Sequence, residues 1–218
     1  MSEQIKIVYE GGQGEIAEKK SRFICNVFAV SSEEEAIACI EKMKKQYWDA
    51  RHNCFAYVIG ERQQIARCSD DGEPSGTAGK PMLDVLLSNH LSNVAVVVTR
   101  YFGGTLLGTG GLVRAYQKST QAGLENSVIF EKRFGKQISI LTDYTGIGKL
   151  QYIVATMELH ELDTEYTDKV VMKLLVPNEQ QKELEEKVTE ATSGQAKIEV
   201  EEELCYGIHN KEVILLEQ

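Results

Sequence analysis

The hydrophobic pattern of the first 133 residues alternates between stretches that suit strands and stretches that suit helices. Apolar residues at helical spacing follow Ser32, which begins a capping box with Glu35, and again follow Pro81. Residues 94–101 are almost continuously apolar, which is typical of a strand buried on both faces. The predicted strands are 5–9, 22–30, 54–59, 64–68 and 94–101, and the predicted helices are 33–46, 80–90 and about 109–126.

The pattern changes after residue 133. A strand, a helix that begins at Thr145, two strands, a helix capped by Asn178 and a further strand follow one another. This β-α-β-β-α-β order is that of the ferredoxin-like split unit. We therefore predict an α+β protein with two domains, residues 1–133 and 134–218. The predicted strands of the second domain are 137–141, 161–167, 169–176 and 198–200, with a last strand at 213–216 added to an edge.

Charge is distributed unevenly along the chain. There are 24 Lys and Arg against 33 Asp and Glu, which gives a net charge of −9. All seven Arg and 13 of the 18 Gly lie before residue 134, whereas the acid excess lies after it. Bulk attraction to nucleic acid is therefore disfavoured, but Arg and Gly in the first domain are suited to a local anion site.

Other features of the chain indicate its cellular compartment. No run of about 18 apolar residues is present, so no membrane span is expected. The first residues lack the basic and apolar regions of a secretory signal. Five cysteines without a C-x-x-C motif suggest reduced, mostly buried thiols. We therefore expect a cytoplasmic protein.

A glycine-rich stretch at 99–112 joins the buried strand to the last helix of the first domain. Backbone N–H groups and the helix dipole favour an anion at such a position, and Arg100 and Arg114 would add positive charge. The stretch is not a P-loop, because the Lys-Ser/Thr pair is missing, nor a complete dinucleotide motif, because Val113 stands at the third glycine position. A tight turn that only packs the helix on the strand is the equal alternative.

The second candidate is the loop at 69–79, in which Asp70, Asp71 and Glu73 lie within four residues. Three carboxylates can hold a hard cation such as Mg²⁺, an Arg side chain or a basic peptide. The loop is not an EF-hand, because the later acidic ligands are missing. We favour an Asx-type turn that caps the next helix, or a partner surface, and expect no metal and no other cofactor.

The third candidate is the pair His52 and Cys54, which strand alternation places on one face. A histidine beside a cysteine is compatible with a thiol nucleophile, but no third residue that would orient them is identifiable. Zinc is less favoured still, because no second pair of ligands has suitable spacing. We favour a buried thiol beside a surface histidine.

Taken together, these segments resemble the IMPACT/YigZ family. The matching residues are Lys20-Ser21-Arg22-Phe23, Ala50-Arg51-His52-x-Cys54, the loop from Ser69 to Pro81 and the stretch from Arg100 to Tyr116. The resemblance implies an N-terminal α/β sandwich of the left-handed βαβ type, similar to the second domain of a small-subunit ribosomal protein. It also implies a ferredoxin-like C-terminal domain similar to those of translocating elongation factors.

The family resemblance also bears on function. Eukaryotic members are translational regulators that act on a kinase pathway through an additional N-terminal domain. This chain begins at the region that the family shares, so we do not expect it to act on that kinase pathway. No reaction is implied for bacterial members, so whether the protein is an enzyme stays open. The fold analogies suggest contact with the ribosome or nucleic acid.

Three hypotheses follow. The leading one is a cytoplasmic, translation-linked regulatory protein whose first domain grips phosphates of RNA, of a ribosomal site or of another phosphate-bearing partner. The first alternative is a small-molecule hydrolase or phosphoryl-transfer enzyme that uses Asp70, Asp71 or Glu73 as base or metal ligand. The second is an adaptor whose acidic C-terminal domain binds a basic protein. The expected anion-binding residues are Arg51, His52, Lys80, Arg100, Gly103, Gly104, Gly108, Thr109, Gly110, Gly111 and Arg114.

Overall fold

The computed structural model describes residues 5–209 and 212–216. The chain divides into two compact units, Met1–Glu131 and Lys132–Gln218. Each unit has a hydrophobic core of its own, and each is described by itself below.

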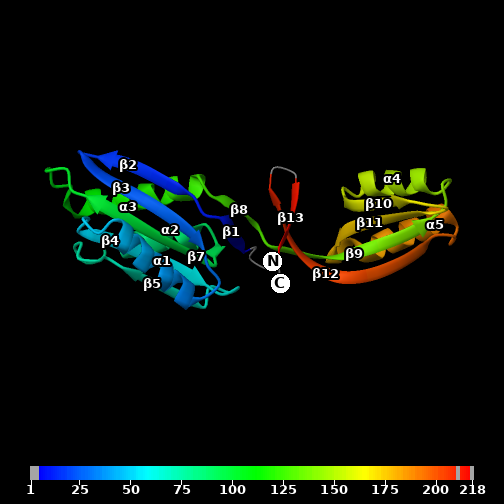
Figure 1. The fold of residues 1–218 in the computed structure, drawn as a ribbon, viewed down its shortest axis with the longest axis horizontal. Coiled ribbons are helices and arrows are strands. Elements are labelled where there is room, and N and C mark those ends of the chain that lie inside the picture. Colours follow the sequence, from blue (N-terminus) through cyan, green and yellow to red (C-terminus); the bar gives the residue numbers. More distant parts are fainter. Residues whose placement is uncertain (1–4, 210–211, 217–218) are drawn as a thin grey trace. The chain divides into compact units, whose positions relative to one another are not determined.

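The main sheet of the first unit has five strands in the order β2-β3-β7-β4-β5, and every neighbouring pair is antiparallel (Figure 1). Helices α2 and α3 cover one face and α1 covers the other. The strands are β2 (Gln13–Glu18), β3 (Ser21–Ala29), β4 (His52–Ile59), β5 (Ile65–Ser69) and β7 (Val94–Tyr101), and the helices are α1 (Glu33–Gln46), α2 (Gly79–Ser88) and α3 (Gly108–Glu125).

Strand β7 shows why its sequence is so apolar. Val94, Val96 and Val98 belong to the core beneath α2 and α3, whereas Ala95 and Val97 belong to the core beneath α1. A strand covered on both faces needs apolar side chains at every position, as predicted. The Ser32 cap of α1 is also present, because the Ser32 side chain accepts a hydrogen bond from the Glu35 N–H, whereas the Glu35 carboxylate accepts from the N–H of Ser31 and not from that of Ser32 as in a full capping box.

The sequence pattern did not predict three strands of this unit. One is β2, which pairs with β3 and lies against α3. The other two are β6 (Leu91–Ser92) and β8 (Val128–Glu131), which flank β1 (Lys6–Glu10) in a separate three-stranded sheet. Helix α3 begins at Gly108, slightly earlier than predicted.

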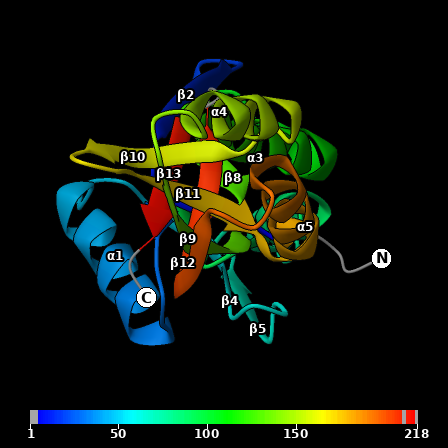
Figure 2. The same ribbon diagram turned by 90° about the vertical axis from the view of Figure 1, so that its right-hand side faces the viewer.

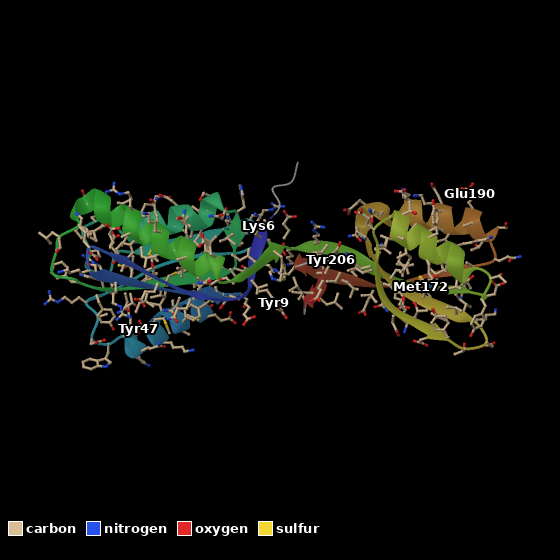
Figure 3. All side chains as sticks on the ribbon, turned by 90° about the horizontal axis from the view of Figure 1, so that it is seen from above. Lys6, Tyr9, Tyr47, Met172, Glu190 and Tyr206 are labelled. Carbon is tan, nitrogen blue, oxygen red and sulfur yellow. The ribbon has the colours of Figure 1, made fainter. Side chains whose placement is uncertain are left out.

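The second unit has a five-stranded sheet in the order β10-β11-β9-β12-β13, with antiparallel neighbours throughout. Helices α4 and α5 pack on one face of it (Figures 1 and 2). The side chain of Met172 lies in the core between sheet and helices, whereas Glu190 of α5 is exposed (Figure 3). The elements are β9 (Arg133–Thr142), α4 (Ile147–Thr156), β10 (His160–Tyr166), β11 (Val170–Pro177), α5 (Gln181–Thr192), β12 (Lys197–His209) and β13 (Glu212–Leu216).

The predicted β-α-β-β-α-β order is present, and β13 pairs with β12 at the sheet edge as expected. The predicted cap of α5 was wrong: Asn178 opens a 3₁₀ turn (Asn178–Gln180), and the residue that precedes the helix is Gln180. The mixed α+β class of the whole chain is confirmed. The hand of the βαβ connection and the likeness to a ribosomal protein stay predictions.

Candidate functional site

The candidate residues gather where β7 ends and β4 begins. Arg100 pairs in register with Phe23 of β3 on one side and with His52 of β4 on the other. Directly opposite residues in a sheet point to the same face, so these three side chains form a row. This row lies on the face that α2 and α3 cover, because Val98 and Cys54 point the same way into that core. The loop at 70–78 and the first turns of α3 meet it there.

Arg100 lies inside the protein and does not form part of an exposed anion site. Its side chain is 8% exposed, and its Nη1 donates to Oε1 of Glu73 at 2.7 Å. The Tyr116 hydroxyl donates to the same oxygen at 2.8 Å. The guanidinium also lies over the rings of Phe23 and Phe102, at 5.5 and 5.7 Å from their centroids. The expectation that Arg100 supplies surface charge is therefore corrected: a partner 27 residues away in sequence neutralises it.

The carboxylates of the acidic loop hold that loop in place. Both oxygens of Asp70 accept backbone hydrogen bonds, from Gly76 at 2.8 Å, Ala78 at 3.0 Å and Gly79 at 2.8 Å. Burial alone would raise the pKa of Asp70, but these three N–H groups outweigh it and hold the pKa below its usual value. Asp70 thus caps the start of α2, as the turn interpretation proposed.

The other two acids are engaged as well. The Asp71 carboxylate accepts from the Asn53 N–H at 2.7 Å. The backbone carbonyl oxygen of Asp71 lies 2.8 Å from Nδ1 of His52. Glu73 is buried and paired with Arg100 and Tyr116. Within residues 5–209 and 212–216, no group of three or more His, Cys, Asp or Glu side chains is arranged to hold a metal ion.

Cys54 is buried beneath this loop. Its sulfur lies 3.0 Å from the carbonyl oxygen of Asp70 and 3.3 Å from the hydroxyl oxygen of Tyr116. Burial raises the pKa of the thiol far above its usual range, so the sulfur stays protonated and is a poor nucleophile. The geometry therefore agrees with the buried-thiol interpretation, with His52 half-buried and anchored to the loop.

The glycine-rich loop has one anchored end and an exposed middle. At Gly103 an added Cβ would lie 2.0 Å from the backbone carbon of Lys20, and the Gly103 N–H donates to the Ser21 hydroxyl at 3.1 Å. Further on, Gly104 and Gly108 have φ of +83° and +69°, and nothing lies within 4 Å of a Cβ placed on either. Side chains do not cover these glycines, and Leu106 beside them is 82% exposed.

Helix α3 begins in this exposed loop. Its N-cap residue, Leu107, supplies no side-chain hydrogen bond to the first turn. Thr109 and Gly110 are exposed and Gly111 is half-buried. Arg114 is exposed too, and its Nη1 would lie 3.7 Å from a Cβ placed on Gly110. An uncapped helix start beside a guanidinium group is chemically suited to an anion.

The other two predicted cations lie outside α3: Arg51 directly precedes β4 and Lys80 is on α2. Arg51 is exposed, and Lys80 pairs with Asp84 on α2 at 2.6 Å. Sequence reasoning overlooked Lys20, which is exposed and whose backbone packs on Gly103. Its place in the Lys20-Ser21-Arg22-Phe23 motif was the signal that could have identified it.

The architecture and this site define a two-domain protein of a known family. The Impact N-terminal domain matches residues 19–124, and a domain of unknown function, DUF1949, matches residues 140–195. The chain is 44% identical to IMPACT family member YvyE of Bacillus subtilis strain 168 over 199 residues, 91% of each chain. It is 34% identical to IMPACT family member YigZ of Escherichia coli K12, covering 81% of this chain and 87% of that protein. The chain belongs to the IMPACT family.

A solved structure agrees with this assignment. A crystal structure described as that of a hypothetical protein is 31% identical in sequence and superposes with a TM-score of 0.57. The match covers 93% of this chain and 99% of that one. Among the residues that the structure describes, no helix is both long enough and apolar enough to cross a membrane.

Proposed function

We propose that this protein is a cytoplasmic, translation-linked regulator whose first unit binds phosphates of RNA or of a ribosomal site. The binding surface would be the glycine-loop surface, which consists of residues 104–110 with Arg114 and Lys20. The observation that carries the proposal is the exposed, uncapped start of α3 beside the exposed Arg114, in a loop whose Gly103 packs on the backbone of the exposed Lys20. Membership of the IMPACT family supports the link to translation, because eukaryotic members of the family regulate it.

The physical basis of the proposal is that this surface offers hydrogen-bond donors to a phosphate. The first N–H groups of an α-helix have no partners within the helix, and the helix dipole favours negative charge beside them. The glycines Gly104, Gly108 and Gly110 are exposed and carry no side chain that would keep a phosphate away from the backbone. Arg114 adds a forked donor that matches a phosphate. Arg100 acts as a positioning residue, because its pair with Glu73 joins the end of β7 to the acidic loop.

The test is co-sedimentation of the full chain with RNA or ribosomes at several salt concentrations. We expect the wild type to bind with a salt-dependent affinity. Arg114→Ala with Lys20→Ala should weaken binding by about 10-fold or more, since each lost charged hydrogen bond costs roughly 1.5–3 kcal/mol.

Arg62→Ala with Lys45→Ala is the charge-matched control, because both residues are exposed and neither belongs to the glycine-loop surface. It should bind like the wild type. The proposal is wrong if the wild type does not bind in a salt-dependent manner, or if the control loses as much affinity as the double variant.

The hydrolase alternative has no observation in its favour. Asp70 caps α2, Asp71 holds the start of β4, and Glu73 is buried with Arg100. A general base or a metal ligand needs lone pairs that face a substrate. Each of these three carboxylates directs at least one oxygen to a donor inside the protein.

A further inference from the structure

The second unit contains a cavity of about 360 Å³ beside its sheet. The cavity lies at the C-terminal end of β9. There β9 is flanked by the first residue of β11 on one side and the first residue of β12 on the other. The beginning of α4 and the end of α5 complete the walls. The volume lies within the range of small-molecule sites, roughly 300–1,000 Å³.

Lysines from three separate elements line this cavity. Lys149 comes from α4, Lys169 from the turn between β10 and β11, and Lys197 from the start of β12. These are three of the eight lysines after residue 133, whereas one of the 17 acidic residues in that segment, Asp143, lines the cavity. The most acidic half of the chain therefore carries a locally basic cavity.

The lysines are only weakly engaged by the protein. Lys149 Nζ donates to the carbonyl oxygen of Ala191 at 2.7 Å. Lys197 Nζ lies 3.9 Å from Oε2 of Glu199, and both side chains are mostly exposed. Lys169 makes no ion pair with any residue in the described part of the chain. Each ammonium group thus keeps donors for a ligand.

Asp143 makes no ion pair with these lysines in the described part of the chain. One of its oxygens accepts from the Thr145 hydroxyl at 2.7 Å, the Thr145 N–H at 3.0 Å and the Gly146 N–H at 2.8 Å. The Thr145 hydroxyl and these amides lower the pKa of Asp143, and the charge of Lys149 is also among the causes that lower it. The carboxylate therefore stays ionised and turned toward the chain that leads into α4.

Two exposed tyrosines lie near the lining residues in sequence, although neither is among the residues that line the cavity. Tyr144 stands between two lining residues, is 55% exposed, and donates its hydroxyl to the carbonyl oxygen of Thr167 at 2.5 Å. The ring of Tyr166 is 6.4 Å away and 58% exposed. Exposed aromatic rings next to basic groups are the usual partners of nucleobases.

We propose that this cavity binds a nucleoside monophosphate, either free or as the phosphorylated end of an RNA. The phosphate lies among the ammonium groups of Lys149, Lys169 and Lys197, and the base stacks on Tyr144. The inference does not rest on the glycine-loop surface, since it uses other residues in the other unit.

The test is an NMR titration of the isotopically labelled full chain with AMP at low salt. Amide shifts should move for residues of 141–149, 167–169 and 192–197, with inorganic phosphate giving a weaker version of the same pattern. Adenosine, which lacks the phosphate, should bind at least tenfold more weakly than AMP. Shift changes confined to 103–114 would overturn the inference and support the glycine-loop surface instead, and no change anywhere would overturn it outright.

Two charge-matched variants localise the binding. Lys169→Gln/Lys197→Gln should weaken AMP at least tenfold, because two ammonium donors are lost. Lys182→Gln/Lys187→Gln removes the same charge from α5 outside the cavity and should leave AMP binding unchanged. Equal losses in the two variants would show a general charge effect and contradict the site.

Tyr144→Ala distinguishes the contribution of the base to the affinity from that of the phosphate. It should weaken AMP severalfold and leave inorganic phosphate unaffected, and an unchanged AMP affinity would remove the nucleoside from the proposal. A 5′-phosphorylated trinucleotide distinguishes the two sources. Affinity at or above that of AMP identifies an RNA end, and weaker affinity identifies a free nucleotide.

Discussion

Single residues decide how the end of the first unit's main sheet is held. Arg100, Glu73, Tyr116 and Cys54 form a connected buried group that joins two strands, a loop and a helix. The Nε atom of Arg100 is buried and has no hydrogen-bond partner. A buried ion pair stabilises weakly in itself, but leaving one charge without the other is costly.

We predict that Arg100→Met will lower the free energy of unfolding by about 3–5 kcal/mol, because the Glu73 charge is left buried without its cation. Adding Glu73→Gln should restore much of this loss, since Gln still accepts from Tyr116 and carries no charge. Urea unfolding measures both. Arg114→Met, at an exposed position, should change stability by about 0.5 kcal/mol or less. Simple additivity of the Arg100 and Glu73 changes would contradict this account.

Asp70 gives a pH-dependent prediction. Its pKa is lowered in the folded protein, so its contribution is complete above the unfolded pKa of about 3.9 and is lost as the pH falls through the folded value. Asp70→Asn should cost about 1–2 kcal/mol at pH 7, by loss of a charged helix cap. The difference from the wild type should shrink steadily below about pH 4.

Denaturant melts between pH 2.5 and 7 measure this difference. Asp84→Asn is the control, since Asp84 makes an exposed i,i+4 pair with Lys80 worth about 0.3–0.5 kcal/mol. If the free energy of unfolding of Asp70→Asn differs from that of the wild type by the same amount at pH 3 as at pH 7, the negative charge of Asp70 does not stabilise the fold.

Among the elements, the glycine loop and the hairpin between β2 and β3 depend on each other. Gly103 is the contact point, since any side chain there would enter the backbone of Lys20 and Ser21. Gly110 lies in the first turn of α3, and its nearest neighbour beyond the helix backbone is the flexible end of Arg114. The two glycines are therefore in the same segment but under different constraints.

This difference yields a paired prediction. Gly103→Ala should destabilise the first unit by about 1–3 kcal/mol, because overpacking displaces backbone. It should also weaken phosphate binding, since the loop must shift. Gly110→Ala should be neutral or stabilise by up to about 1 kcal/mol, as Ala favours a helix. Thermal melts and RNA co-sedimentation measure the two effects. Equal behaviour of both variants would mean that the Lys20 contact does not position the loop.

Elements with a strong local signal were predictable from the sequence, and those that depend on distant partners were not. The continuous apolar run of β7 and the Ser32 cap of α1 were confirmed. Strand β2 was missed because its sequence, QGEIAE, has little strand character: it exists by pairing with β3, and Gly14 lets it lie close to Ala122 of α3. Likewise, the position of Arg100 at a strand end was predicted correctly. Its burial depends on Glu73 and Tyr116, which no local pattern reveals.

At the scale of the whole molecule, acidic charge is concentrated in the second unit. Glu183, Glu186 and Glu190 are exposed along α5, and Glu199, Glu202 and Glu203 are exposed along β12. Charges spread over a surface attract a basic partner at long range but bind it weakly. The adaptor hypothesis stays a prediction and can be tested on the intact chain.

We predict that an oligolysine peptide binds the full chain weakly at low salt and dissociates near physiological ionic strength, where the Debye length is about 8 Å. Glu183→Gln/Glu186→Gln/Glu190→Gln should reduce the low-salt binding. Fluorescence anisotropy of a labelled peptide measures both. Binding that persists at high salt would indicate a shaped acidic site and would favour the adaptor hypothesis instead.

The close approach of Gly103 to Lys20 has a consequence for motion. With no side chain between them and a hydrogen bond to Ser21, the tip of the β2–β3 hairpin and the glycine loop cannot separate without breaking backbone packing. Amide hydrogens of the two segments should therefore exchange with solvent through one shared opening. A phosphate held by the start of α3 would slow exchange in the hairpin too, so that a ligand seated on one element would rigidify its neighbour.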